Sequence, residues 1–105
     1  LTINDKSKLI KIKFDDILYI ETSKRQLIIH TINGHEIIKM SMRKLEKLLN
    51  KDFFRCHNSF IVNLEKINKI DVSDIYINNA TIPISKHRRK QLKARLIEVL
   101  GDKLC

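Results

Sequence analysis

The chain has 105 residues, 43% hydrophobic and 31% charged, which is enough for one domain with a modest core. No apolar run reaches the roughly 20 residues that a membrane-spanning helix needs, the first ten residues lack the apolar core of a secretory signal, and two cysteines are too few for a disulfide framework. The 21 Lys and Arg against 12 Asp and Glu give a net charge of +9, which is typical of proteins that bind nucleic acid or anionic membrane. The low cysteine count favours a cytoplasmic protein with reduced thiols. Because the chain begins with Leu, we also expect it to be one domain, residues 1–105, of a longer protein.

The first forty residues predict short strands separated by polar breaks. Alternating or β-branched apolar residues favour strands at residues 8–13, 17–22, 27–32 and 36–40. Asp15-Asp16 predicts the first turn, and residues 23–26 form a polar break between two strands. Asn33-Gly34 lies between two apolar runs and predicts a hairpin, with both residues at positive φ in a type I′ turn.

A short helix is expected after these strands. Ser41 is a suitable N-cap, and residues 50–52 (Asn-Lys-Asp) end the apolar repeat. Four apolar residues share one face over about two turns: Met42, Leu45, Leu48 and Leu49.

The second half of the chain predicts further short strands, at residues 60–62, 67–71, 75–77 and 81–84. Asn78-Asn79 is a plausible hairpin turn. Pro83 has no N–H to donate to a ladder, so its strand should lie at an edge or end there.

The last element is expected to be an amphipathic helix over residues 86–100. Its apolar repeat consists of Leu92, Leu96, Val99 and Leu100. Ser85 is the predicted N-cap and Gly101 the predicted stop. Many short strands with one short and one terminal helix predict a mainly-β domain.

Residues 53–63 (FFRCHNSFIVN) combine apolar bulk with several hydrogen-bonding groups. A strand that served only the core would not be preceded by Arg55, His57, Asn58 and Ser59. Guanidinium, amide and hydroxyl groups suit an oxygen-rich anion such as a phosphate backbone.

The start of the last helix breaks an electrostatic preference. Helix N-termini favour acidic side chains, whereas residues 86–90 read Lys-His-Arg-Arg-Lys and the next acid is Glu98. The arrangement makes sense if an anion binds at that end, since backbone N–H groups and cations then converge on it. The alternative is a solvated basic face.

Three blocks of the sequence resemble the LytTR family, the LytR/AlgR-type DNA-binding output domain of bacterial response regulators. Residues 16–21 (DILYIE), 55–63 (RCHNSFIVN) and 82–89 (IPISKHRR) look like its early strand, its central signature and its closing strand with the start of its last helix. The resemblance implies an elongated stack of small antiparallel sheets with one short helix and a C-terminal helix. It also implies sequence-specific binding of double-stranded DNA at promoter direct repeats, an upstream receiver domain, and pairing of two copies on DNA.

The resemblance also implies which residues would read bases. In the family, the loop corresponding to residues 23–26 reaches the major groove, and Arg25 or its neighbour Lys24 matches the base-reading position. His87 matches a second reading position that carries Arg in many relatives, and Arg88 beside it is expected to share that role. The arginine fork pairs well with guanine O6 and N7, whereas histidine should discriminate less.

Phosphate contacts are expected from six further residues: Arg55, Asn58, Ser59, Ser85, Lys86 and Lys90. Asn63 matches a recurrent family position, but its side chain is expected to satisfy the backbone of a turn. His57 is open between a DNA-facing role and a structural one, in which the imidazole bonds to a carbonyl.

Two other functions are alternatives to DNA binding. An RNA- or ribosome-associated domain would need aromatic residues to stack on bases, and the chain has only four Phe and two Tyr, mostly in apolar strands. A membrane-surface helix at residues 86–100 would carry cations along one face, whereas here they gather at one end. We therefore expect no membrane partner.

Enzyme and metal chemistry have little support in the sequence. Cys56 and His57 are adjacent, so on a strand they point to opposite faces and cannot form a catalytic pair. The histidines and cysteines show no zinc spacing, and His30 with His35 across the predicted hairpin supplies too few ligands. We expect no enzymatic activity, no metal and no cofactor.

Overall fold

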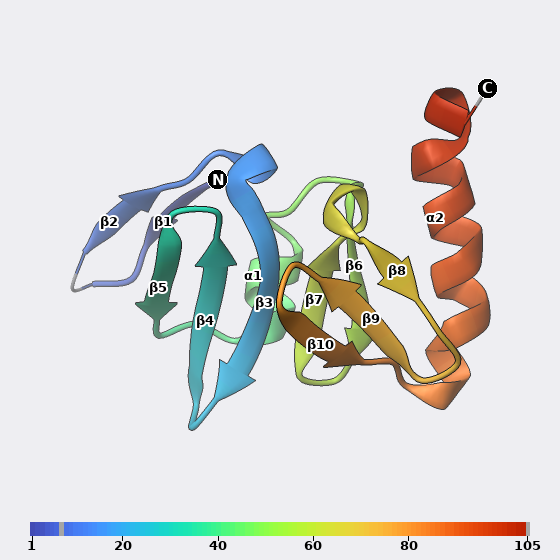
Figure 1. Ribbon diagram of the computed structural model, residues 1–105. Coiled ribbons are helices and arrows are strands. Elements are labelled where there is room, and N and C mark those ends of the chain that lie inside the picture. The colour runs from blue at the N-terminus through green and yellow to red at the C-terminus, as the bar shows by residue number, and fades with distance from the viewer. Residues whose placement is uncertain (7, 105) are drawn as a thin grey trace.

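The computed structural model describes residues 1–6 and 8–104, with side chains through residue 101 (Figure 1). Its strands form three antiparallel sheets. The first pairs β1 (Thr2–Asn4) with β2 (Leu9–Lys11). The second has the order β5 (Gly34–Ile38), β4 (Gln26–Thr31), β3 (Ile17–Ser23), β7 (Phe60–Asn63) and β6 (Phe53–His57). The third has the order β10 (Ala80–Pro83), β9 (Asp74–Ile77) and β8 (Lys69–Ile70).

The helices are short except for the last. Single turns of 3₁₀ helix form η1 (Phe14–Asp16), η2 (Leu64–Lys66) and η3 (Lys86–Arg88), while α1 spans Met42–Glu46 and α2 spans Arg89–Leu104. The molecule measures 42 × 27 × 25 Å, and its long dimension runs from the β1–β2 sheet to α2 (Figure 1). The expected elongated, mainly-β stack of small antiparallel sheets is confirmed.

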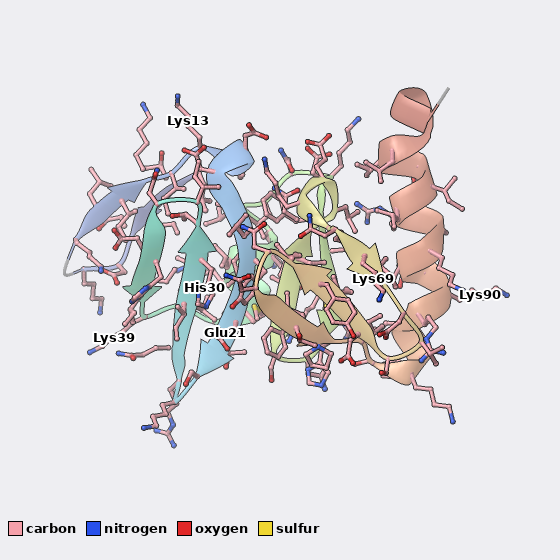
Figure 2. The ribbon with its side chains drawn as sticks, viewed as in Figure 1. Lys13, Glu21, His30, Lys39, Lys69 and Lys90 are labelled. Atoms are coloured by element: carbon pink, nitrogen blue, oxygen red, sulfur yellow. The ribbon has the colours of Figure 1, made fainter. Side chains whose placement is uncertain are left out.

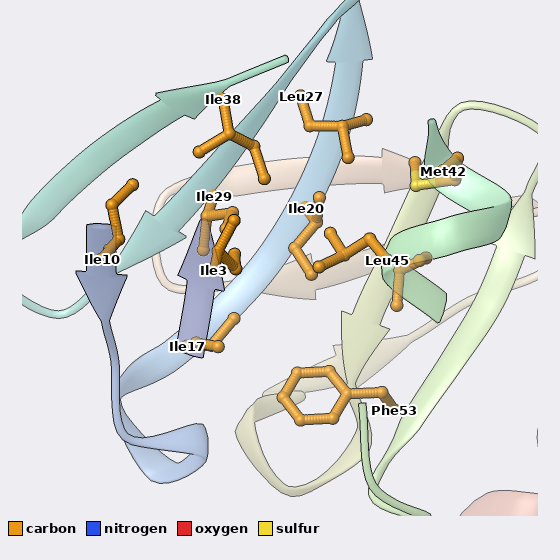
Figure 3. Packing of buried hydrophobic residues seen from close by; sticks show 11 residues of the cluster. Ile3, Ile10, Ile17, Ile20, Leu27, Ile29, Ile38, Met42, Leu45 and Phe53 are labelled. Atoms are coloured by element: carbon orange, nitrogen blue, oxygen red, sulfur yellow. The ribbon is translucent and has the colours of Figure 1, made fainter. Parts of the chain in front are cut away.

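The central sheet is buried on both faces. Successive strand residues point to opposite faces, so the consecutive apolar pairs Phe53-Phe54 and Ile61-Val62 each supply both cores. Phe53 and Ile61 belong to the core covered by β1–β2 and α1, which Figure 3 shows from close by. Phe54 and Val62 belong to the other core, under β8–β10 and α2.

Several local predictions are confirmed. The Asn78-Asn79 turn joins β9 to β10, with Asn78 at φ 51°, and Pro83 ends the edge strand β10. The Ser41 hydroxyl caps α1 by accepting a hydrogen bond from the backbone N–H of Lys44 at 3.1 Å. Leu92 is fully buried in the α2 interface, as its repeat predicted.

The predicted turn type at Asn33-Gly34 is wrong, although the hairpin exists. Thr31 pairs directly with Gly34, so the loop residues are Ile32 and Asn33. Only Gly34, at φ 138°, lies at positive φ there. The Thr31 hydroxyl accepts from the Asn33 N–H and donates to the Gly34 carbonyl, which gives the turn a local alternative to type I′.

The strand predictions miss two strands. β1 has only three residues, of which Ile3 is buried, so it is too short to show the alternation of apolar and polar residues that predicts a strand. β6 is a strand in its own right, although only residues 60–62 of the central block were predicted as one. The predicted strand at residues 8–13 shortens to β2, and Asp15-Asp16 lies in η1 rather than in a simple turn.

Both helix predictions need correction at their ends. The α1 segment is shorter than two turns, and Leu48 is 43% exposed because the chain leaves the helix before its side chain can turn inward. Gly101 does not stop α2, which continues through Leu104. Ser85 lies at the N-cap position of the 3₁₀ turn η3, which precedes α2, but its side chain makes no capping hydrogen bond.

Candidate nucleic-acid interface

The turn between β3 and β4 is a two-residue hairpin whose apex is Lys24-Arg25. Ser23 pairs with Gln26, and both apex residues adopt left-handed backbone conformations, with φ 49° and 68°. Positive φ at both positions defines a type I′ turn, which Asn and Gly favour and which costs other residues roughly 1 kcal/mol each. The turn places two cationic side chains at an exposed tip, which is the lowest point of the ribbon in Figure 1. Strain retained at an exposed basic apex is a reason to infer function there.

The turn between β6 and β7 is held by several hydrogen bonds. Arg55 donates through Nη2 to the Asn58 carbonyl at 2.8 Å and through Nη1 to Oε1 of Glu46 at 3.4 Å. The Ser59 N–H donates to Nδ1 of His57 at 3.0 Å. The Ser59 carbonyl accepts from the N–H of Thr22 at 3.0 Å, which ties this turn to β3.

The start of the last helix is bonded to the same turn. Arg88 donates through Nη1 to the Arg55 carbonyl at 2.8 Å and through Nη2 to Oδ1 of Asn58 at 3.3 Å. The backbone N–H of Ser85 donates to the carbonyl of Cys56 at 2.8 Å. The guanidinium of the half-buried Arg88 thus bonds to other groups of the protein, while His87 next to it is exposed.

A shallow groove of about 330 Å³ brings the two turns together. It is lined by Arg25, Arg55, Asn58 and Ser59, four of the residues expected to contact DNA. Of the other expected contacts, Lys24 lies beside Arg25 at the hairpin apex. The remaining five lie at the η3–α2 start, which the Arg88–Asn58 bond connects to the groove: Ser85, Lys86, His87, Arg88 and Lys90.

The groove has lining residues that the sequence did not predict as DNA contacts: Thr22, Gln26, Leu27, Met40, Ser41 and Met42. A signal existed for Thr22 and Gln26, because residues flanking a hairpin turn lie beside it. No signal existed for Ser41, which reaches the groove only through the packing of α1.

The cations of this surface differ in whether they have an acidic partner. Within residues 1–6 and 8–101, Lys24, Arg25, Lys86 and Lys90 form no ion pair, whereas Arg55 is paired with Glu46. The Arg55 side chain is 23% exposed, and its Nε is buried without a hydrogen-bond partner among the described residues. Arg55 therefore shapes the β6–β7 turn at least as much as it faces outward.

Asn63 and His57 both form hydrogen bonds with the backbone. Asn63 is 2% exposed; its Nδ2 donates to the Ile17 carbonyl at 2.9 Å and its Oδ1 accepts from the Glu65 N–H at 3.1 Å. Its predicted role in satisfying turn backbone is confirmed. For His57, the structural alternative predicts a bond to a carbonyl, whereas its Nδ1 accepts from the Ser59 backbone N–H. The DNA-facing alternative stays a prediction.

Cys56 lies beneath the β6–β7 turn and is fully buried. Burial raises the pKa of its thiol from 9.0 to about 12, which disfavours the thiolate needed for nucleophilic chemistry. Its Sγ lies 3.6 Å from the Pro83 carbonyl and 3.9 Å from the Phe60 carbonyl. These contacts make Cys56 part of the core.

His30 and His35 pair across the β4–β5 hairpin, with ring centroids 6.2 Å apart. His30 is already engaged: its Nε2 is 2.7 Å from Oε1 of Glu21 and its ring stacks on Tyr19 at 4.2 Å. Among the residues described, no group of three or more potential ligands could hold a metal. No helix in the described part of the chain has the length and apolar character to cross a membrane.

Comparisons with known proteins agree with this geometry. The family model of the LytTr DNA-binding domain matches residues 7–97. Accessory gene regulator protein A of Staphylococcus aureus is 35% identical over 77 residues, which is 70% of this chain and 32% of that protein. The protein of the same name in Staphylococcus epidermidis is 34% identical over the same shares. The chain therefore spans about a third of the length of these curated relatives.

A solved structure shares the fold. It is the LytTr DNA-binding domain of a putative methyl-accepting/DNA response regulator from Bacillus cereus, with a TM-score of 0.76 and 28% identity over 91% of this chain and 94% of that one. The family is one of DNA-binding domains, not of enzymes. Since its model covers most of the residues and the sheets superpose on a solved member, this chain belongs to the LytTR family of DNA-binding domains.

Proposed function

We propose that this chain binds double-stranded DNA sequence-specifically, as the output domain of a two-component response regulator that controls transcription. One observation carries the proposal: a strained, exposed Lys24-Arg25 apex shares a groove with Arg55, Asn58 and Ser59 in a LytTR domain. The name of the staphylococcal relatives, which describes gene regulators, supports the same conclusion. The cytoplasm follows as the location, because the DNA is there.

The Lys24-Arg25 apex inserts into one major-groove segment. A two-residue hairpin tip is narrow enough for a groove about 12 Å wide. The Arg25 guanidinium can donate two parallel hydrogen bonds to guanine O6 and N7, whereas the Lys24 ammonium is a point charge. Arg25 is therefore the base reader, and Lys24 contributes attraction to the backbone.

The η3–α2 start addresses the next major-groove segment. His87 is exposed and can donate to a base acceptor, while Lys86 and Lys90 approach phosphates together with the Ser85 hydroxyl. Arg88 would have to leave the Arg55 carbonyl and Asn58 to read a base. It acts instead by fixing the helix start against the β6–β7 turn.

The β6–β7 turn sits between these two reading elements and meets the backbone. Asn58 is exposed, and it lines the groove together with Ser59 and Arg55. Their fixed geometry would set the angle between the two reading elements. Contacts of this kind position the protein without carrying sequence information.

Two copies are proposed to bind a promoter direct repeat, each as the C-terminal part of a longer chain with an upstream receiver domain. Phosphorylation of the receiver would raise occupancy by favouring pairing on DNA, without altering chemistry in this domain.

Selection of random duplex DNA on this chain at moderate salt, read out by sequencing, tests the proposal. Enrichment of a short motif, repeated at about one helical turn of roughly 34–36 Å, is the expected result. Uniform recovery that disappears as salt rises would instead identify a non-specific polyanion binder and overturn sequence-specific function.

A further inference from the structure

A second groove adjoins the one between the two turns. It has a volume of about 630 Å³ and is lined by Lys6, Lys39 and Lys44, together with Asn4, Asp5, Met40 and Ser41. Met40 and Ser41 line both grooves. The two hollows are therefore neighbours on one surface, joined at the corner between β5 and α1.

The second groove is basic. All three lysines are exposed, and none forms an ion pair within residues 1–6 and 8–101. The one carboxylate in the lining, Asp5, accepts the backbone N–H of Lys8 at 3.1 Å and that of Lys39 at 3.3 Å. Asp5 thus fastens the β1–β2 loop to the end of β5, and the lining keeps a positive balance.

The groove continues the edge that carries the Lys24-Arg25 apex. In Figure 1 this apex and the start of the last helix both point to the lower edge, and Figure 2 places Lys39 at the lower left. Lys13 lies at the opposite, upper edge in the same view. The molecule is 42 Å long, more than the 34–36 Å of one turn of DNA. A duplex along the lower edge would therefore pass phosphates in front of both ends.

We propose that Lys39 and Lys44, assisted by Lys6, contact the phosphate backbone of the same duplex on the far side of the Lys24-Arg25 apex. This inference rests on the proposed DNA binding and extends its footprint beyond the two turns. Lysine suits a backbone contact, because its compact ammonium on a flexible stem needs no fixed geometry. The contacts add affinity for every sequence and discriminate between none.

The salt dependence of affinity, measured by fluorescence anisotropy with one selected duplex, tests this. Each phosphate contact contributes about 0.9 to the slope of log K against log salt. Lys39→Ala and Lys44→Ala should each lower the slope by about 0.9. When the salt rises from 50 to 200 mM, the fold-loss of affinity of each variant should therefore be smaller than that of the parent by a factor of about 3.5. The double variant should lower the slope by about 1.8 and leave the selected motif unchanged.

Lys13→Ala is the matched control, since it also removes one exposed charge but from the opposite edge. It should keep the parental slope. If Lys39→Ala and Lys44→Ala match Lys13→Ala, only the net charge matters and the proposal is overturned. If the parent's affinity for its motif falls steeply with salt and the variants do not differ from it, this inference alone is overturned. If the parent binds no duplex, the proposed function is overturned as well.

Discussion

The two turns that border the shared groove are built in opposite ways. The β3–β4 turn holds Lys24 and Arg25 in left-handed conformations, and neither side chain has an ion-pair partner among the described residues. The β6–β7 turn has no residue at positive φ, and its polar groups bond to Arg55, Arg88 and β3. One turn keeps its cations available at the expense of backbone strain, and the other uses its cations to stay rigid.

The difference separates two kinds of basic residue that composition cannot distinguish. A guanidinium that bonds to protein carbonyls, like that of Arg88, fixes the shape of the surface. An exposed guanidinium without such bonds, like that of Arg25, remains available to a ligand. Substitutions that affect one turn and not the other test this difference.

Arg88→Ala should have the largest effect. Two charge-assisted hydrogen bonds, to the Arg55 carbonyl and to Asn58, disappear, which should lower the free energy of unfolding by about 3 kcal/mol. Urea unfolding measures the loss, and Arg88→Lys should recover less than half of it because an ammonium lacks the fork. Lys86→Ala is the control and should change stability little. Equal stability of the two alanine variants would show that Arg88 is not a structural anchor.

Arg25→Ala should leave stability nearly unchanged but weaken binding to the selected DNA site by about 1–3 kcal/mol. It should also relax preference at one base position, which repeated selection on the variant would show. Lys24→Ala and Arg55→Ala should weaken all sequences about equally. If Arg55→Ala changed base preference and Arg25→Ala did not, the roles of the two turns would be reversed.

Raising the pH should loosen the rigid side of the interface through Cys56. The unfolded chain loses the thiol proton above its ordinary pKa of 9.0, but burial keeps the folded thiol protonated up to about 12. The contribution of the Cys56 thiol to the free energy of unfolding is therefore fully present below pH 9. It declines as pH rises toward 12, and the free energy of unfolding should be lower by about 1.4 kcal/mol at pH 10. Urea unfolding from pH 7.5 to 10 in a Cys105→Ser background, with and without Cys56→Ala, isolates it. Parallel pH profiles would contradict the buried thiol.

The smallest effect concerns the strain at the β3–β4 apex. Arg25→Gly and Arg25→Ala both remove the guanidinium, but only glycine adopts φ 68° without steric cost. Arg25→Gly should therefore be more stable than Arg25→Ala by about 1 kcal/mol, with the same loss of DNA binding. Thermal unfolding compares the two. A less stable glycine variant would show that the apex is not strained.

Sequence reasoning reached most of the fold because its signals are local. The Asn78-Asn79 turn, the Ser41 cap and the apolar repeat containing Leu92 each depend on a few neighbouring residues. It failed where tertiary context decides: Gly101 continues α2, and Leu48 stays exposed although its spacing places it on the apolar face. The candidate contacts were found through the family blocks, and their individual roles remain predictions.

The positive charge, the strand-and-turn pattern and the family membership can all be read from the sequence. These properties follow from composition, from residue periods of two and 3.6, and from turn chemistry, all of which act over short stretches. Which cations already bond to other groups of the protein depends instead on the tertiary packing. Arg88 meets Asn58 across 30 positions of sequence, and the groove of Lys39 and Lys44 meets that of Arg25 through the corner at Met40 and Ser41. Such contacts depend on sheet register and on which faces pack together, and no local pattern encodes them.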